Sequence, residues 1–136
     1  MPTLHLIKFK PPIALLPKGT SHWALFLPHE CEEGDSEGLL YSVKKESFTS
    51  TKTEFQRAKF DPGSACDVLS CIALNEICIK HALLAAVCYE VSDGRPFHLI
   101  SRNCQHWVYE VIEKLTMQSN MADVGQKVIK RIKDTK

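Results

Sequence analysis

The stretch Ser101-Arg102-Asn103-Cys104-Gln105-His106-Trp107-Val108 opens the most regular amphipathic segment of the chain. Beyond it, apolar residues recur with the i, i+1, i+4, i+5, i+8 spacing of one helix face, which predicts an α-helix packed against a core. That stripe consists of Trp107, Val108, Val111, Ile112 and Leu115. Cys104 precedes Trp107 by three residues and Val108 by four, so it shares their face and is expected to point inward toward a sheet.

The same position favours reactive chemistry at Cys104. In the first turn of a helix, unpaired backbone N–H groups and the positive end of the helix dipole stabilise a thiolate. Cysteines at such positions can have a pKa of roughly 3.5 to 7.5 instead of about 8.5. Because the thiolate is the form that attacks a carbonyl carbon, Cys104 is the candidate nucleophile. A backbone N–H at the helix start, with Asn103 or Gln105 beside it, is the candidate oxyanion site.

Residues 22–27 form a second short segment, an apolar run ended by Pro28 that predicts a core strand. Alternation divides it into two faces, with Trp23, Leu25 and Leu27 on one and His22, Ala24 and Phe26 on the other. The small side chain of Ala24 leaves room for a helix on the His22 face. If that face meets the helix of Cys104, a thiolate–imidazole pair can form with His22 as its base.

Strands are predicted in the first half of the chain and helices in the second, which favours an α+β fold over a parallel α/β sheet, in a single domain over residues 1–136. Further strands are expected at residues 4–9, 39–43 and 54–60. A helix is expected to follow Asn75 as its N-cap and to run through Val91. An irregular helical spacing of apolar residues continues to Ile132. Residues 66–74 are ambiguous between strand and helix.

The formal net charge is only +1, which argues against a general nucleic-acid binder. No apolar run approaches the roughly 18 residues of a membrane span, so no stable membrane insertion is expected. The first ten residues lack the pattern of a signal peptide, so a cytoplasmic protein with reduced cysteines is expected. The chain has no C-x-x-C motif or second ligand cluster, and no metal or other cofactor is predicted.

Structural interpretations compete with the functional ones at each candidate residue. Cys104 can be a core cysteine at a helix end, and His22 a strand-end residue bonded to a backbone carbonyl. Trp23 and Trp107 flank the candidate pair and are possible substrate contacts, although core packing is the favoured interpretation. His81 is expected to be a satisfied core histidine. Four cysteines lie in the most apolar stretch and are predicted to be small core residues, at positions 66, 71, 78 and 88.

Two motifs resemble those of a known superfamily. Ser21-His22-Trp23-Ala24-Leu25-Phe26-Leu27 resembles the histidine strand of the lecithin:retinol acyltransferase-like proteins, and Asn103-Cys104-Gln105-His106-Trp107-Val108 resembles their nucleophile helix. Similar pieces, in the same order, occur in the PPPDE isopeptidases. Both groups belong to the NlpC-type, permuted papain-like superfamily. The chain is most similar to small fungal proteins of unknown function that carry His-Trp-Ala-Leu and Asn-Cys-Gln-x-Trp motifs.

This resemblance implies a cysteine at a helix N-terminus packed on an antiparallel sheet that carries the histidine. It implies Cys104 as nucleophile and His22 as base. In the acyltransferase-like proteins a second histidine follows on the next strand, whereas here Ser42 falls near that place, and serine orients an imidazole only weakly. The hydrophobic membrane tail of many such relatives is not found in this sequence.

The leading hypothesis is therefore a thiol hydrolase or acyltransferase that acts on an ester, thioester or amide through Cys104 and His22. A non-catalytic module that uses the same cleft to bind a small molecule or protein is the alternative. It is favoured by the serine at position 42. A redox role for neighbouring cysteines is a third hypothesis that the spacing does not require.

Overall fold

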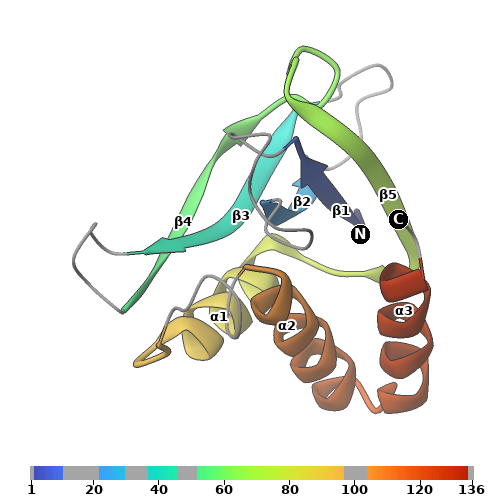
Figure 1. The fold of residues 1–136 in the computed structure, drawn as a ribbon. Helices are drawn as coiled ribbons and strands as arrows, with labels where there is room; N and C mark the ends of the chain where they lie inside the picture. The colour runs from blue at the N-terminus through green and yellow to red at the C-terminus, as the bar shows by residue number, and fades with distance from the viewer. Residues whose placement is uncertain (1, 11–21, 30–36, 46–51, 97–103, 135–136) are drawn as a thin grey trace.

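The structure is a computed structural model that describes residues 2–10, 22–29, 37–45, 52–96 and 104–134. Within these ranges five strands precede three helices (Figure 1). The strands are β1 (Thr3–Phe9), β2 (Trp23–Pro28), β3 (Gly38–Lys45), β4 (Thr53–Phe60) and β5 (Val68–Cys78), and the helices are α1 (His81–Ser92), α2 (Cys104–Gln118) and α3 (Ala122–Asp134). The predicted α+β class is confirmed.

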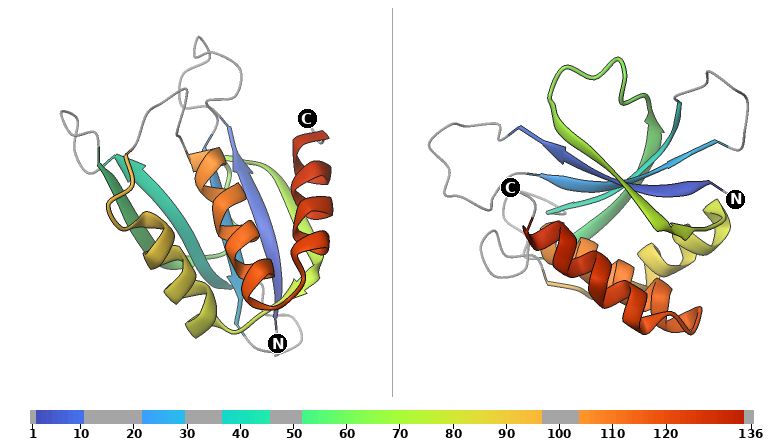
Figure 2. Two further views of the ribbon diagram at one scale, coloured as in Figure 1. Left: turned by 90° about the horizontal axis from the view of Figure 1, so that it is seen from below. Right: turned by 90° about the vertical axis from the view of Figure 1, so that its right-hand side faces the viewer.

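The strands form one antiparallel sheet in the order β4-β3-β2-β1-β5. Although β4 and β5 are consecutive in the chain, they lie at opposite edges, and their connection arches over one end of the sheet (Figure 1). All three helices lie on the same face of the sheet, with α2 between α1 and α3 (Figure 2). Each strand therefore has a helix-facing side and an opposite side.

Alternation along the strands produces two apolar clusters, one on each face of the sheet. The larger lies between the sheet and the helices and includes Leu4, Leu6, Trp23, Leu25, Leu27, Tyr41, Val43 and the stripe of α2. The smaller lies on the opposite face and is formed by Ile7, Phe9, Ala24 and Phe26, with Leu40, Phe60 and Val68 packed against it. Both faces of the central strands β1 and β2 are thus buried.

The predicted strands and the C-terminal helix are confirmed, and the ambiguous residues 66–74 fall largely within β5. The expected N-cap is wrong, because Asn75 lies inside β5 and α1 begins at His81. The reason is tertiary: β5 continues to pair with β1 as far as Thr3↔Cys78, which holds this segment extended. The sequence also predicts a short extended piece at residues 97–100, which lie outside the described residues.

The prediction that four cysteines are core residues is correct only for Cys88. Cys66, Cys71 and Cys78 are exposed. Cys71 and Cys78 belong to β5, which is an edge strand of the sheet that the described residues form, so part of this apolar sequence remains at the surface.

Within the described residues, none of the helices combines the length and the hydropathy that a membrane crossing requires. Nor do the described ranges contain a group of three or more histidine, cysteine, aspartate or glutamate side chains arranged to hold a metal ion.

The packing of α3 on α2 depends on a close approach at Gly125. The chain reverses at Asn120, which has a φ of 57°, and Gly125 then lies against Thr116 of α2. A Cβ added at Gly125 would collide with the Thr116 hydroxyl, which is held by bonds to the carbonyls of Ile112 at 2.8 Å and Glu113 at 3.0 Å.

We therefore expect Gly125→Ala to destabilise the protein by about 1–2 kcal/mol, although alanine favours a helix by roughly 1 kcal/mol over glycine. Urea unfolding measures the change, with the exposed neighbour Gln126→Ala as a control. Adding Thr116→Ala is expected to restore the stability lost by Gly125→Ala. A stabilised single variant would show that the contact does not limit packing.

Candidate functional site

Cys104 is the first residue of α2, and its side chain is buried against β2. The backbone N–H of Trp23 donates a hydrogen bond to the Cys104 Sγ, with an N···S distance of 3.3 Å. The two sequence motifs, 81 residues apart, therefore meet in direct contact. The helix-start position predicted for Cys104 and its inward orientation are both observed.

The order of the sheet explains why this N–H is available. Phe9 N–H bonds to the His22 carbonyl, so by strand alternation the N–H of Trp23 points to the other side, toward β3. In the described residues the pairing of β2 with β3 runs from Leu25↔Tyr41 to Pro28↔Gly38 and does not reach Trp23. The Cys104 thiol thus occupies the place of a strand partner, where the ladder has ended.

Two opposing effects act on the Cys104 thiol. Burial raises its pKa above the ordinary value, because a thiolate loses solvation in the core. The backbone N–H groups of Trp23, Cys104 and Gln105 act in the opposite direction, since they donate toward the sulfur. Burial is the larger effect, so the resting site favours the neutral thiol while holding donors in place for a negative sulfur.

His22 is not on the face expected to meet Cys104. The helix-facing residues of β2 are Trp23, Leu25 and Leu27, whereas the His22 ring lies on the opposite face, 5.5 Å from the ring of Phe9 between centroids. Among the described residues no hydrogen bond joins the His22 ring to Cys104 Sγ. Burial lowers the pKa of His22 below its ordinary value of 6.5, and the carboxylate of Asp67 opposes this shift.

Ser42 also lies away from Cys104. Its neighbours Tyr41 and Val43 are in the helix-facing cluster, so Ser42 projects to the opposite face of β3. There the side chain is nearly buried, with 9% of its surface exposed. The structure therefore brings Cys104 together with the backbone of the histidine motif, but not with the side chains of His22 and Ser42.

The two tryptophans have different surroundings. Trp107 is fully buried, and its Nε1–H donates to Ser92 Oγ at 2.9 Å, so the favoured interpretation as a core residue is confirmed. Trp23 is also buried, and lies between the amine of Lys8, 4.6 Å from its ring centroid, and the ring of Tyr109 at 5.7 Å. Gln105 is half-buried beside Cys104, and Asn103 lies outside the described residues.

His81 is satisfied at both ring nitrogens, as predicted, but it is half-buried and not a core residue. Its Nε2 lies 3.1 Å from the Pro28 carbonyl oxygen, and its Nδ1 lies 2.6 Å from the Tyr41 hydroxyl. A carbonyl only accepts, so the Nε2–H donates to Pro28 and Nδ1 accepts from Tyr41. This network ties the start of α1 to β2 and β3. Its partner Tyr41 could not be identified from spacing, because nothing in the sequence relates the two residues.

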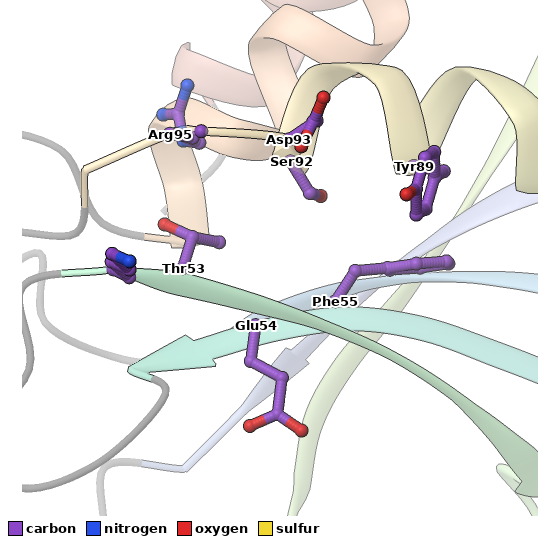
Figure 3. Close-up of a pocket in the computed structure, with 9 residues that line it drawn as sticks. Thr53, Glu54, Phe55, Tyr89, Ser92, Asp93 and Arg95 are labelled. Carbon is purple, nitrogen blue, oxygen red and sulfur yellow. The ribbon is translucent and has the colours of Figure 1, made fainter.

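A cavity of about 490 Å³ lies between β4 and the last turn of α1, and the sequence did not indicate it (Figure 3). Tyr89 and Ser92 border it from α1, while Thr53 and Phe55 border it from β4; Glu54 points to the other side of the strand (Figure 3). The ring of Phe55 stacks on that of Tyr41, with 6.3 Å between the ring centroids. The centroid of its ring is also 6.2 Å from that of Trp107, which belongs to the helix that carries Cys104.

Comparison with known proteins returns one family. A family model described as a family of unknown function, DUF6540, matches residues 13–122. No curated protein and no solved structure matches the chain.

The burial of His22 predicts a dependence of stability on pH. Because the pKa of His22 is lower in the folded protein than in the unfolded chain, the unfolded chain binds the proton more readily below pH 6.5. His22 therefore contributes a loss of stability as pH falls from about 6.5 through the folded pKa. We expect His22→Gln to lose less stability than the wild type between about pH 7.5 and pH 5.

Urea unfolding at several pH values measures this difference. His106→Gln is the matched control, because His106 is exposed on α2. Equal slopes for wild type and His22→Gln would contradict the lowered pKa that follows from the half-buried placement of His22.

Proposed function

We propose that this chain, which belongs to the DUF6540 family, is a cysteine-dependent hydrolase or acyltransferase of the permuted papain-like kind, with Cys104 as its nucleophile. The observation that carries the proposal is the hydrogen bond from Trp23 N–H to Cys104 Sγ. It joins the histidine-strand motif to the nucleophile-helix motif, as the resemblance to the NlpC-type superfamily implies. An antiparallel sheet with the cysteine at a helix start also fits that fold.

In the proposed reaction the Cys104 thiolate attacks the carbonyl carbon of an ester, thioester or amide. A C–S bond forms, the bond to the leaving group breaks, and the leaving group takes up the proton removed from the thiol. Water, an alcohol or an amine then attacks the acyl-cysteine and restores the thiol. The N–H groups of Trp23, Cys104 and Gln105 are available to stabilise the negative sulfur as it is released.

The proposed base is His22, which is joined to Trp23 by a single peptide bond. In the described arrangement its ring rests against Phe9 on the other face of the sheet. The ring has to leave that contact to accept the Cys104 proton. The proposal therefore requires a rearrangement at the start of β2, and the effect of His22 on reactivity tests it directly.

Reaction with an activated ester tests the nucleophile. With p-nitrophenyl acetate at neutral pH, we expect mass spectrometry to find the acetyl group on Cys104 before the exposed thiols of Cys66, Cys71 and Cys78. Cys104→Ser should abolish this reaction. His22→Ala should slow it by roughly 10²-fold or more, the typical contribution of a general base.

The cysteines of the chain supply the controls. Cys88 is fully buried with its pKa raised by burial, and it should react last in every variant. If Cys104 reacts more slowly than the exposed thiols, in line with its burial, the catalytic proposal fails. If Cys104 reacts first but His22→Ala has no effect, Cys104 is the nucleophile and His22 is not its base.

A binding function is the second candidate, and two observations favour it. The side chains of His22 and Ser42 lie away from Cys104, and the cavity between β4 and α1 provides a separate place for a ligand. The cavity is bordered by two aromatic residues, Phe55 and Tyr89, and by the hydroxyl of Ser92 (Figure 3). Such a lining suits a small ring that also forms hydrogen bonds.

Ligand-observed NMR with phenol and indole as probes measures binding to this cavity. We expect binding that Cys104→Ser leaves unchanged and Tyr89→Ala weakens, because Tyr89 is 67% exposed and can be truncated without loss of the core. Leu83→Ala, on α1 but away from the cavity lining, is the control. Binding that is absent, or equal in all variants, would contradict a ligand site in this cavity.

A further inference from the structure

We propose that the outer edge of β5 is a self-association surface, on which two copies of the chain pair their β5 strands antiparallel. This inference is independent of the chemistry at Cys104. It rests on the backbone groups that β5 leaves open, on the charges of the two sheet edges and on the symmetry of the β5 sequence.

The open edge is defined by the hydrogen-bond alternation of the sheet. The backbone N–H of Phe9 donates to the His22 carbonyl, just before β2, and that of Lys10 donates to the Asp67 carbonyl, just before β5. The backbone groups of alternate β1 residues therefore point to β2 and to β5. The residues opposite Lys8, Leu6 and Leu4 are Ser70, Ile72 and Leu74, whose backbone groups therefore point to β1. The N–H and C=O groups of Cys71 and Ala73 consequently point outward.

No described strand, helix or loop pairs with this outward edge between Ser70 and Leu74. Figure 1 shows β5 as the last strand of the sheet, with no strand beyond it. Backbone groups in such a row pair readily with an added strand. The edge is also apolar: Leu69 at its start is 58% exposed, and Cys71 is exposed within it.

The opposite edge of the same sheet has a different composition. β4 carries Glu54, Arg57 and Lys59, and charged side chains on an edge strand are a common protection against unwanted pairing. β5 has no charged residue from Val68 through Asn75. Because one edge is protected and the other is not, the uncharged edge of β5 is the one suited to association.

A second copy of the chain fits this edge better than an unrelated strand. Register shifts at Thr3/Leu4 and Lys8/Phe9 leave the regular run Ser70–Leu74, whose centre is Ile72. A two-fold axis at Ile72 places Cys71 opposite Ala73 of the second copy and closes the pairing after two chains. In that register the uncharged run of one copy lies opposite the uncharged run of the other, so no like charges oppose each other within it.

The cysteines give this arrangement a specific signature. The two Cys71 side chains would be diagonal neighbours, with their backbones roughly 7–8 Å apart. A parallel pairing would instead bring each cysteine next to its own counterpart.

Sedimentation velocity between about 1 μM and about 1 mM protein tests the proposal, since a short strand pairing is a small interface and its dimer should dissociate on dilution. We expect a reversible monomer–dimer equilibrium. Ala73→Pro should abolish it, because proline removes an outward N–H and leaves the bonds to β1 intact. Lys59→Pro makes the same change at the β4 edge, because the backbone N–H of Lys59 also points outward by strand alternation. This variant should leave the dimer unchanged.

A second variant covers the outcome in which Ala73→Pro fails to fold. Cys71→Lys keeps the backbone, places two positive charges across the axis and should also prevent dimerisation, whereas Cys71→Ser should not. A short bismaleimide should join Cys71 to Cys71 of the second copy in the wild type. A monomer at every concentration, or a dimer unaffected by both Ala73→Pro and Cys71→Lys, would overturn the proposal; growth beyond two chains would overturn the closed pairing.

Discussion

The burial of the α2 stripe against the helix-facing side of β1, β2 and β3 is the contact on which the rest of the structure depends. The five apolar residues of the stripe are almost entirely removed from solvent, and each such side chain contributes roughly 1.5–3 kcal/mol on burial. α2 lies between α1 and α3, so both outer helices are positioned through it (Figure 2). Two contacts fix the packing further: Trp107 donates a hydrogen bond to Ser92 of α1, and Gly125 of α3 packs closely against Thr116 of α2.

The same contact decides what surrounds Cys104. Because Trp107 and Val108 pack into the core, Cys104, one turn earlier, lies against β2, where the N–H of Trp23 has no strand partner among the described residues. Successive side chains of a strand point to opposite faces of the sheet. Trp23, not His22, therefore faces the helix, and the imidazole of His22 joins Phe9 on the far side of the sheet. Thiol chemistry at this site requires the start of β2 to rearrange, and a binding function does not.

The sheet also explains the exposed cysteines. β5 is held extended by β1 and cannot bury both of its faces and its outer edge at once, because the helices cover only one face. The apolar side chains of Cys71 and Leu69, which are residue types typical of a core, thus remain at the surface. The charged residues of β4 show that the other edge follows a different pattern, so the two edges are not equivalent surfaces.

The sequence alone determined the α+β class, the strands of the first half and the helix face that contains Cys104, because these follow from local periodicity and from prolines that end strands. It also identified the two motifs that meet in space. Only the tertiary structure decided which face of β2 meets α2, that residues 68–78 form an edge strand, and where the cavity beside Phe55 lies. Periodicity divides a strand into two faces, but it cannot say which face a distant helix will cover, since both faces of β2 are apolar and both are buried.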